Sequence, residues 1–360
     1  GSWYAHQQVP LAPGETIQRL VLLDDNLYVM TDQAALIAVD AAVGKQRWRV
    51  TVSLAGRKVY TPSHVDNMPL REEVWTDTVA KAPEAEQFPR INAVAVNDLA
   101  HMLLIERESG KIYRDIKFDR TSATNAGVCD EERFYYPGLD NMCNCYNLML
   151  GQVIWWQSYT GLAEVPLRTY AGRVYVGTSD GRMQCMTGGS VGIRKWTLTF
   201  DRPILAPFHV GPRGLFFAVG NQVRAHDAIS GLKLWEPVYV DGVIEDGMQL
   251  SGTTLYQHAR GDGLYAINLT NGEVRWHRPG GWMVLAVMDG QAYVLDTDAN
   301  LHVMNEITGE VTASVPMARF DFFVPNTQSP AIYAATRSGQ IYCIRKSDAG
   351  RLTAEMLQQD

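Results

Sequence analysis

Charged and aromatic side chains are the candidates for binding chemistry in this sequence. The tripeptide Phe-Asp-Arg occurs at 118–120 and again at 200–202, and related acidic positions follow further along the chain. Carboxylate and guanidinium groups gathered on one surface can bind a peptide, a cation or a small ligand. The candidate partner or ligand face is therefore Asp119, Arg120, Asp201, Arg202, Asp241, Asp321, Trp75 and Trp282. Because a repeated position often serves a repeated need of the fold, we favour the alternative in which the Asp–Arg pairs latch neighbouring structural units.

The cysteines predict core packing. Cys145, Cys185 and Cys343 share one repeated position, which is alanine in other repeats at Ala38, Ala225 and Ala266. A free cysteine at such a position behaves as a small hydrophobe. A disulfide from Cys129 to Cys143 or Cys145 remains open. No Cys-rich or His-rich cluster indicates a metal site.

The sequence shows no motif for catalysis or for nucleic-acid binding. The eight histidines are dispersed, there is no CxxCH and no phosphate-binding loop, and the segments at 179–181 and 261–263 fit turns between strands. The net charge of −7 argues against a nucleic-acid partner, because that binding depends on clustered basic residues. No apolar run approaches the roughly 18 residues that span a bilayer. We predict no catalytic residue, no cofactor and no metal.

A repeat of the chain must position these side chains. Glycine recurs at 44, 110, 151, 192, 231, 272, 309 and 350, with spacings of 37 to 41 apart from 66 between the first two. Each repeat divides into four short β-rich runs separated by turn residues. Four strands in about 40 residues are typical of a propeller blade. We predict an all-β, eight-bladed β-propeller of four-stranded antiparallel blades, as a single domain over residues 1–360.

A polar residue, a glycine and a tryptophan recur together in this repeat. The segments "DAAVGKQRW" at 40–48, "DAISGLKLW" at 227–235 and "NLTNGEVRW" at 268–276 show the pattern. The polar residue and the glycine suit the turn between the third and fourth strands. The large tryptophan on the fourth strand is expected to wedge between neighbouring blades. These structural tryptophans are Trp48, Trp155, Trp196, Trp235 and Trp276. The second repeat offers Tyr113 nearby, and the last two have no aromatic residue there, so they should be held differently.

Two regions fall outside the repeat. An insertion is expected at about 55–89, in the crossover between blades one and two, and its aromatic residues Tyr60, Trp75 and Phe88 suit either a partner contact or a packed surface lid. The termini should meet in the eighth blade. Its outer strand comes either from "SWYAHQQV" at the N-terminus or from "RLTAEML" near the C-terminus.

The recurring segments resemble the tryptophan-docking repeat of the pyrroloquinoline quinone (PQQ)-like propeller superfamily, over nearly the whole chain. The superfamily contains Ca²⁺- and PQQ-dependent dehydrogenases as well as non-enzymatic BamB-type scaffolds. The dehydrogenases are longer and use an adjacent Cys-Cys disulfide, whereas this chain has Cys143 and Cys145 separated by one residue. In size the chain is similar to the scaffolds.

We therefore expect a non-enzymatic, monomeric scaffold that binds a protein partner. The alternatives are a PQQ/Ca²⁺-dependent oxidoreductase and a propeller that binds carbohydrate or another small ligand. The resemblance implies a bacterial periplasmic or secreted setting. The chain begins Gly-Ser, which we take as a cloning remnant, and we expect a signal peptide or lipid anchor to have been removed.

Overall fold

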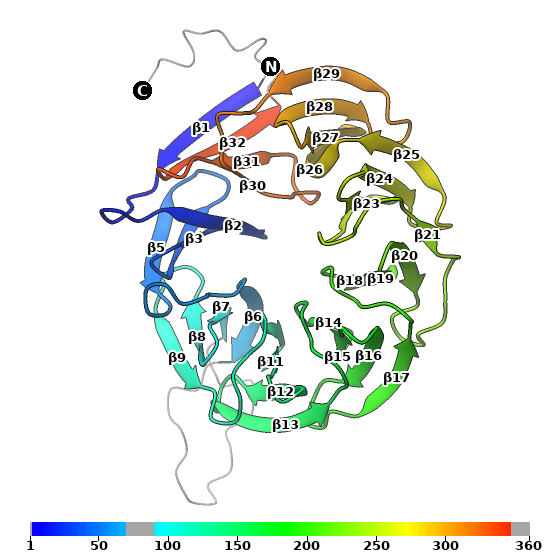
Figure 1. The fold of residues 1–360 in the computed structure, drawn as a ribbon. Helices are drawn as coiled ribbons and strands as arrows, with labels where there is room; N and C mark the ends of the chain where they lie inside the picture. The colour runs from blue at the N-terminus through cyan, green and yellow to red at the C-terminus, as the bar shows by residue number, and fades with distance from the viewer. Residues whose placement is uncertain (1, 70–89, 347–360) are drawn as a thin grey trace, which may run out of the picture. The chain divides into compact units, whose positions relative to one another are not determined.

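The computed structural model describes residues 2–69 and 90–346. Within these ranges the chain forms strands and no helix, so no described helix could cross a membrane. Eight four-stranded antiparallel sheets form an eight-bladed β-propeller, as the repeat predicts (Figure 1). By compactness the chain divides into unit 1, residues 1–49, 216–226 and 233–360, and unit 2, residues 50–215 and 227–232.

The first four blades follow the order of the chain. Blade one is β2 (Ile17–Leu23), β3 (Asn26–Thr31), β4 (Ala35–Asp40) and β5 (Gln46–Thr51). Blade two is β6 (Ser63–Pro69), β7 (Arg90–Asn97), β8 (His101–Glu106) and β9 (Ile112–Lys117). Blade three is β10 (Val128–Asp130), β11 (Arg133–Pro137), β12 (Met142–Asn147) and β13 (Gln152–Ser158). Blade four is β14 (Arg168–Tyr170), β15 (Arg173–Gly177), β16 (Arg182–Thr187) and β17 (Arg194–Thr199).

The next three blades follow the same pattern, and the eighth differs. Blade five is β18 (His209–Gly211), β19 (Gly214–Val219), β20 (Gln222–His226) and β21 (Val238–Tyr239). Blade six is β22 (Gln249–Ser251), β23 (Thr254–Ala259), β24 (Gly263–Asn268) and β25 (Val274–Pro279). Blade seven is β26 (Gly281–Met288), β27 (Gln291–Asp296), β28 (Asn300–Asn305) and β29 (Val311–Pro316). Blade eight is β30 (Phe322–Phe323), β31 (Ile332–Ala335), β32 (Gln340–Lys346) and β1 (Ser2–Gln8).

The N-terminal strand supplies the outer strand of blade eight. β1 pairs with β32 over its whole length, from Ser2 opposite Lys346 to Gln8 opposite Gln340 (Figure 1). Of the two alternatives that the sequence left open, the structure has the N-terminal one, and residues 351–357 lie outside the described residues. Pairing strands from the two ends of the chain gives β32 a partner that would otherwise be missing at a sheet edge.

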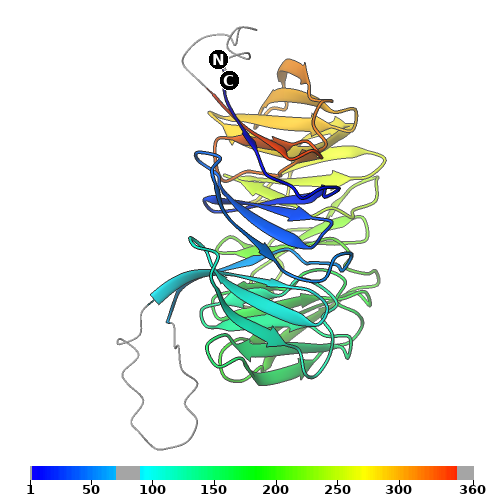
Figure 2. The same cartoon turned by 90° about the vertical axis from the view of Figure 1, so that its left-hand side faces the viewer.

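The insertion lies differently from the expectation. Residues 63–69 form β6, the first strand of blade two, which pairs with β7 so that Pro69 lies opposite Arg90 (Figure 2). The prediction that all of 55–89 lies in the crossover between blades one and two is wrong in this respect. The error arose because β6 has a weak strand pattern, Ser-His-Val-Asp-Asn-Met-Pro. Residues 70–89 lie outside the described residues. They include Trp75 and Phe88 of the expected lid.

Small residues line the third strands, as the repeat predicts. Cys145, Cys185, Ala38, Ala225 and Ala266 are fully buried, and Cys343 is nearly so. Aliphatic and aromatic residues of neighbouring strands pack against them in both units. A larger side chain would displace these neighbours, because protein cores are close-packed.

Candidate partner-binding surface

The recurring polar residue closes the turn between the third and fourth strands. In blade one, Asp40 Oδ1 accepts hydrogen bonds from the N–H groups of Ala42 at 2.8 Å and Val43 at 3.1 Å. The N–H of Gly44 donates to the Asp40 carbonyl at 2.8 Å, and Gly44 has a φ of 75°. Asp227, Asn147, Asn268 and Asn305 serve their turns in the same way. The predicted role of the polar residue and the glycine is confirmed.

Each of four tryptophans contacts the corresponding turn of the next blade. The indole N–H donates to a turn carbonyl at 2.9 to 3.1 Å in four pairs: Trp155 to Gly189, Trp196 to Ile229, Trp235 to Leu269 and Trp276 to Glu306. The ring also lies against the repeat glycine of that turn, so a Cβ on Gly272 would be 2.8 Å from Trp235. The glycine and tryptophan of the repeat therefore form one contact between two blades, which explains why they recur together.

Other groups make this contact where tryptophan is missing. In blade two, the guanidinium of Arg114 donates to the Met149 carbonyl of blade three at 3.2 and 3.3 Å. The sequence analysis pointed to the neighbouring Tyr113, whose hydroxyl instead donates to Glu106 at 2.9 Å within its own blade. An arginine can replace the indole because both present an N–H donor on a large flat group.

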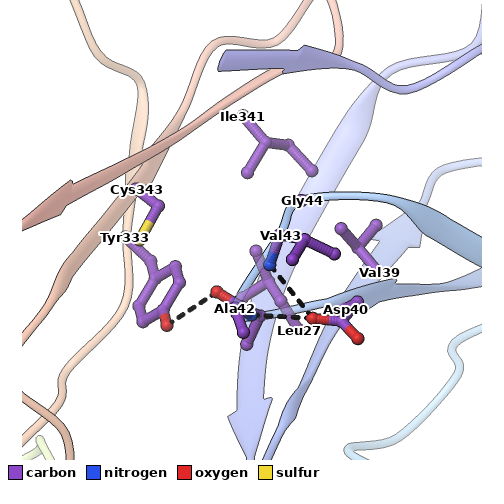
Figure 3. Close-up of a pocket in the computed structure, with 10 residues that line it drawn as sticks. Leu27, Val39, Asp40, Ala42, Val43, Gly44, Tyr333, Ile341 and Cys343 are labelled. Atoms are coloured by element: carbon purple, nitrogen blue, oxygen red, sulfur yellow. Dashed lines mark hydrogen bonds between the residues drawn. The ribbon is translucent and has the colours of Figure 1, made fainter. Parts of the chain in front are cut away.

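At the contact between blades eight and one, the turn of Asp40 to Gly44 receives two donors. The Tyr333 hydroxyl and the Arg345 guanidinium donate to the Ala41 carbonyl at 3.0 and 3.2 Å. In register, Ala5 of β1 lies opposite Cys343, where blades three, four and six have tryptophan. A small hollow of about 20 Å³, open in part to solvent, lies beside this turn between Tyr333, Ile341 and Leu27 (Figure 3). Blades eight and one are thus held differently, as the sequence predicts for a repeat without tryptophan.

Two residues of the candidate face, Asp119 and Arg120, are engaged within unit 2. Asp119 accepts a hydrogen bond from the Tyr146 hydroxyl at 2.6 Å. Burial and this carboxylate together raise the pKa of Tyr146 to about 12. Arg120 contacts Asp140 at 3.2 Å and lies 4.4 Å from the ring centroid of Trp156. These contacts join the crossover after β9 to blade three, and a binding role for the two residues stays a prediction.

The other charged residues of the candidate face lie in separate crossovers. Asp321 accepts a hydrogen bond from the Arg337 backbone at 2.9 Å, and its carboxylate lies 3.5 Å from the Arg337 guanidinium. Asp201 and Arg202 are exposed in the crossover after β17. Asp241 is exposed in the crossover after β21. The structure brings Asp119 together with Arg120, and Asp201 with Arg202, through adjacency in the chain alone.

Trp282 has a polar partner inside unit 1. Its side chain is half-buried in β26 and hydrogen-bonds Asp246. The same carboxylate lies 2.6 Å from Nδ1 of His258. The hydrogen bond from His258 leads the interactions that hold the pKa of Asp246 below its usual range, against the effect of burial. Because the Trp282 side chain is half-buried, only part of its surface is open to a ligand, and a binding role for Trp282 stays a prediction.

A row of exposed leucines, which the sequence analysis missed, lies in unit 2. We call these residues the leucine row, and they are Leu54 (66% exposed), Leu99 (41%), Leu139 (63%), Leu162 (44%) and Leu205 (45%). Each lies in a crossover between blades or in a turn between second and third strands. Because strands alternate in direction within a blade, these two kinds of connection leave a sheet at the same end. The sequence signal was apolar residues at connections, where polar ones are usual.

Hydrogen bonds join each of these connections to the next, so the leucines follow one another along this end of the sheets. Ser53, next to Leu54, donates to Asp98, next to Leu99, at 2.5 Å. The Leu99 carbonyl accepts from Ala123, and the Leu139 N–H donates to Ser122 at 3.0 Å. The hydroxyl of Thr124 then bonds the Ala163 carbonyl, next to Leu162, at 3.2 Å. Finally, the Leu162 carbonyl accepts from Ser179, and the Thr178 carbonyl accepts from Ile204 at 3.2 Å, beside Leu205.

One hydrogen-bonded Asp–His–Ser series lies on blade seven. Nε2 of His302 is 2.8 Å from Asp296 Oδ2, and Nδ1 is 2.8 Å from the Ser314 hydroxyl. Burial opposes ionisation of Asp296, but hydrogen bonds from the Asn300 N–H and from His302 outweigh it and keep the pKa below the usual range. The series joins β27, β28 and β29 across the blade. Arg278 also approaches both ring nitrogens of His302, at 3.4 and 3.5 Å, so the imidazole is held from several sides.

The described residues contain neither a metal-binding cluster of side chains nor a disulfide. No three His, Cys, Asp or Glu side chains among them gather at metal-binding distance. All five cysteines are buried free thiols, so the disulfide from Cys129 left open by the sequence is not formed. Cys129 packs in a different cluster from Cys143 and Cys145, and burial raises the pKa of Cys145 to about 12.

The comparisons with known proteins agree with this geometry. Residues 187–355 match the family model described as outer membrane protein assembly factor BamB. These matched residues resemble PQQ-like β-propeller repeats. The crystal structure of BamB from Moraxella catarrhalis is similar over 97% of this chain and 100% of its own, with a TM-score of 0.66 and 13% identity. A computationally designed protein, Ika8, is similar over 91% of this chain and 96% of its own, with a TM-score of 0.64 and 10% identity. No curated protein matches the chain.

Proposed function

We propose that the protein is a non-enzymatic scaffold that binds a protein partner through the leucine row. The observation that carries this proposal is the row itself: five leucines, each at least 41% exposed, at one end of the sheets of unit 2. Large exposed apolar patches mark sites of protein–protein interaction, and the hydrogen bonds between the connections bring these leucines to neighbouring connections. The similarity to BamB supports the same reading, together with a periplasmic or envelope setting in a bacterium.

The connections are well suited to present these side chains. Backbone hydrogen bonds hold the main chain at Leu99, Leu139 and Leu162, so little backbone conformational entropy is lost when a partner covers these residues. Full burial of one leucine contributes about 1.5–3 kcal/mol. A partner that covers two or three of them gains enough for specific binding, and the sheets behind them do not have to move.

The test is site-specific photo-crosslinking in cells, with a photoreactive amino acid at position 139 or 162 in turn. The matched control is position 232, because Leu232 is 70% exposed and lies at the opposite end of the sheets, between β20 and β21. We expect one cross-linked protein at 139 and 162 that is missing at 232. With that protein purified, Leu139→Asp should weaken its binding at least about tenfold, whereas Leu232→Asp should not.

Equal cross-linking at all three positions, or equal binding by both variants, would show that the row is ordinary surface. Addition of PQQ with Ca²⁺ tests the dehydrogenase alternative. A saturable rise in the melting temperature would support that alternative, because a ligand that binds the folded state raises its stability.

A further inference from the structure

Three basic residues of unit 2 lie on, or in the turn after, the first strands of blades four and five. Arg168 begins β14, His209 begins β18, and Arg213 follows at the turn into β19. β14 and β18 lie side by side (Figure 1). The Arg168 Nε donates to the carbonyl of Phe208, the neighbour of His209, at 3.2 Å. This bond places the guanidinium beside the peptide group that joins Phe208 to His209.

None of the three residues has an acidic partner among the described residues. Arg168 Nε and Nη1 donate to the carbonyls of Phe208 and Leu167, and these bonds leave Nη2 unused. His209 and Arg213 are exposed. Partial desolvation of the imidazole, followed by the charges of Arg168 and Arg213, holds the pKa of His209 below its usual value. Arg168 is half-buried, and a half-buried guanidinium without a counter-charge is unusual, since buried charges are normally paired.

The fold itself does not require a charge at Arg168. Gln249 of blade six occupies the same register, because Arg168 pairs with Tyr175 as Gln249 pairs with Tyr256. Gln249 Nε2 also donates to a carbonyl of the next blade, that of Val284, at 2.6 Å. A neutral amide therefore makes the same contact between blades six and seven, so this contact does not require the positive charge of Arg168.

We propose that Arg168, His209 and Arg213 form a binding site for an oxyanion, a phosphate or a carboxylate. Arg168 presents Nη2, Arg213 presents its guanidinium, and His209 presents a ring N–H, so an oxyanion receives donors from two blades. Charge-assisted bonds of this kind are stronger than neutral ones, and a guanidinium fits both anions in a planar, two-point fashion. The site lies on other residues than the leucine row and does not depend on it.

The experiment is a titration of the whole protein with inorganic phosphate and, separately, with succinate, by calorimetry at constant ionic strength set with KCl. Arg168→Gln removes the charge but keeps the kind of contact that Gln249 makes. Arg213→Gln removes the second cation from an exposed position, where folding is not at stake. The matched control is Arg194→Gln, an exposed arginine on the outer strand β17.

We expect saturable binding of at least one anion, weakened at least about tenfold by Arg168→Gln and by Arg213→Gln, and unchanged by Arg194→Gln. Binding of phosphate alone identifies a phosphate site, and binding of both identifies a general oxyanion site. The pKa of His209, followed by NMR, should rise when the anion binds, because a negative charge favours the imidazolium. Binding of neither anion beyond chloride, or equal binding by Arg168→Gln and the wild type, would overturn the proposal.

Discussion

The contact between Gly272 and Trp235 gives a prediction whose size follows from the structure. Gly272 has a φ of +78°, and a Cβ there would lie 2.8, 2.9 and 3.1 Å from Cδ2, Cε3 and Cγ of Trp235. Gly290 has a φ of +73° and no atom within 4 Å of its Cβ position. Alanine at either position therefore meets the same backbone strain, but only at 272 does it meet a ring.

The strain term is common to both variants. A left-handed conformation costs alanine about 1–2 kcal/mol, and about 0.4–1 kcal/mol returns because alanine restricts the unfolded chain. We expect Gly290→Ala to lower the free energy of unfolding by about 1 kcal/mol. Gly272→Ala adds the cost of overpacking, about 1–3 kcal/mol. The indole cannot simply retreat, because its N–H is bonded to Leu269 at 3.1 Å.

The measurement is urea unfolding followed by circular dichroism for both variants, with and without Trp235→Leu. If the ring causes the extra loss, Trp235→Leu should remove most of the difference between Gly272→Ala and Gly290→Ala, which a double-mutant cycle reads as coupling. Equal losses for the two glycine variants, or no coupling with Trp235, would refute the interpretation of the glycine and the tryptophan as one contact.

Three further predictions follow from other contacts. Burial opposes ionisation of Asp98, but hydrogen bonds from Ser53, Ala100 and His101 outweigh it, so the pKa of Asp98 lies below the usual range. The contribution of the ionised Asp98 to stability is therefore present above about pH 4 and is lost as the pH falls through the folded pKa. Asp98→Asn should make the melting temperature decline less steeply in acid. The five buried thiols should not react with a thiol reagent such as Ellman's reagent in the native protein, and all five should react in urea; fast reaction of any thiol in the native protein would contradict its burial. Removal of residues 2–8 should lower the melting temperature and cause aggregation, because β32 loses a partner along seven residues; an unchanged melting temperature would show that β1 adds nothing to blade eight.

The local pattern of the sequence was enough to predict the number of blades and most of their strands, although it missed β6 of blade two. Asp40 and Gly44 close their turn through bonds between residues four apart, so turn chemistry is readable from spacing alone. The small third-strand position was likewise visible, because Cys145 and Ala266 hold the same place in a strict period. Repetition made these inferences reliable, since each repeat solves the same packing problem.

What depends on neighbouring blades was decided by the tertiary structure. Trp276 was predicted to lie between blades, but its acceptor, the Glu306 carbonyl, belongs to the next repeat and has no mark in the sequence. Arg114 replaces tryptophan in blade two. The sequence pattern indicated the neighbouring Tyr113 instead, because it looks for an aromatic residue. Three further features join segments that are distant in sequence. They are the pairing of the N-terminal strand in blade eight, the leucine row, and the cluster of Arg168 with His209. Their meeting depends on how the blades pack against one another, and no local period records that.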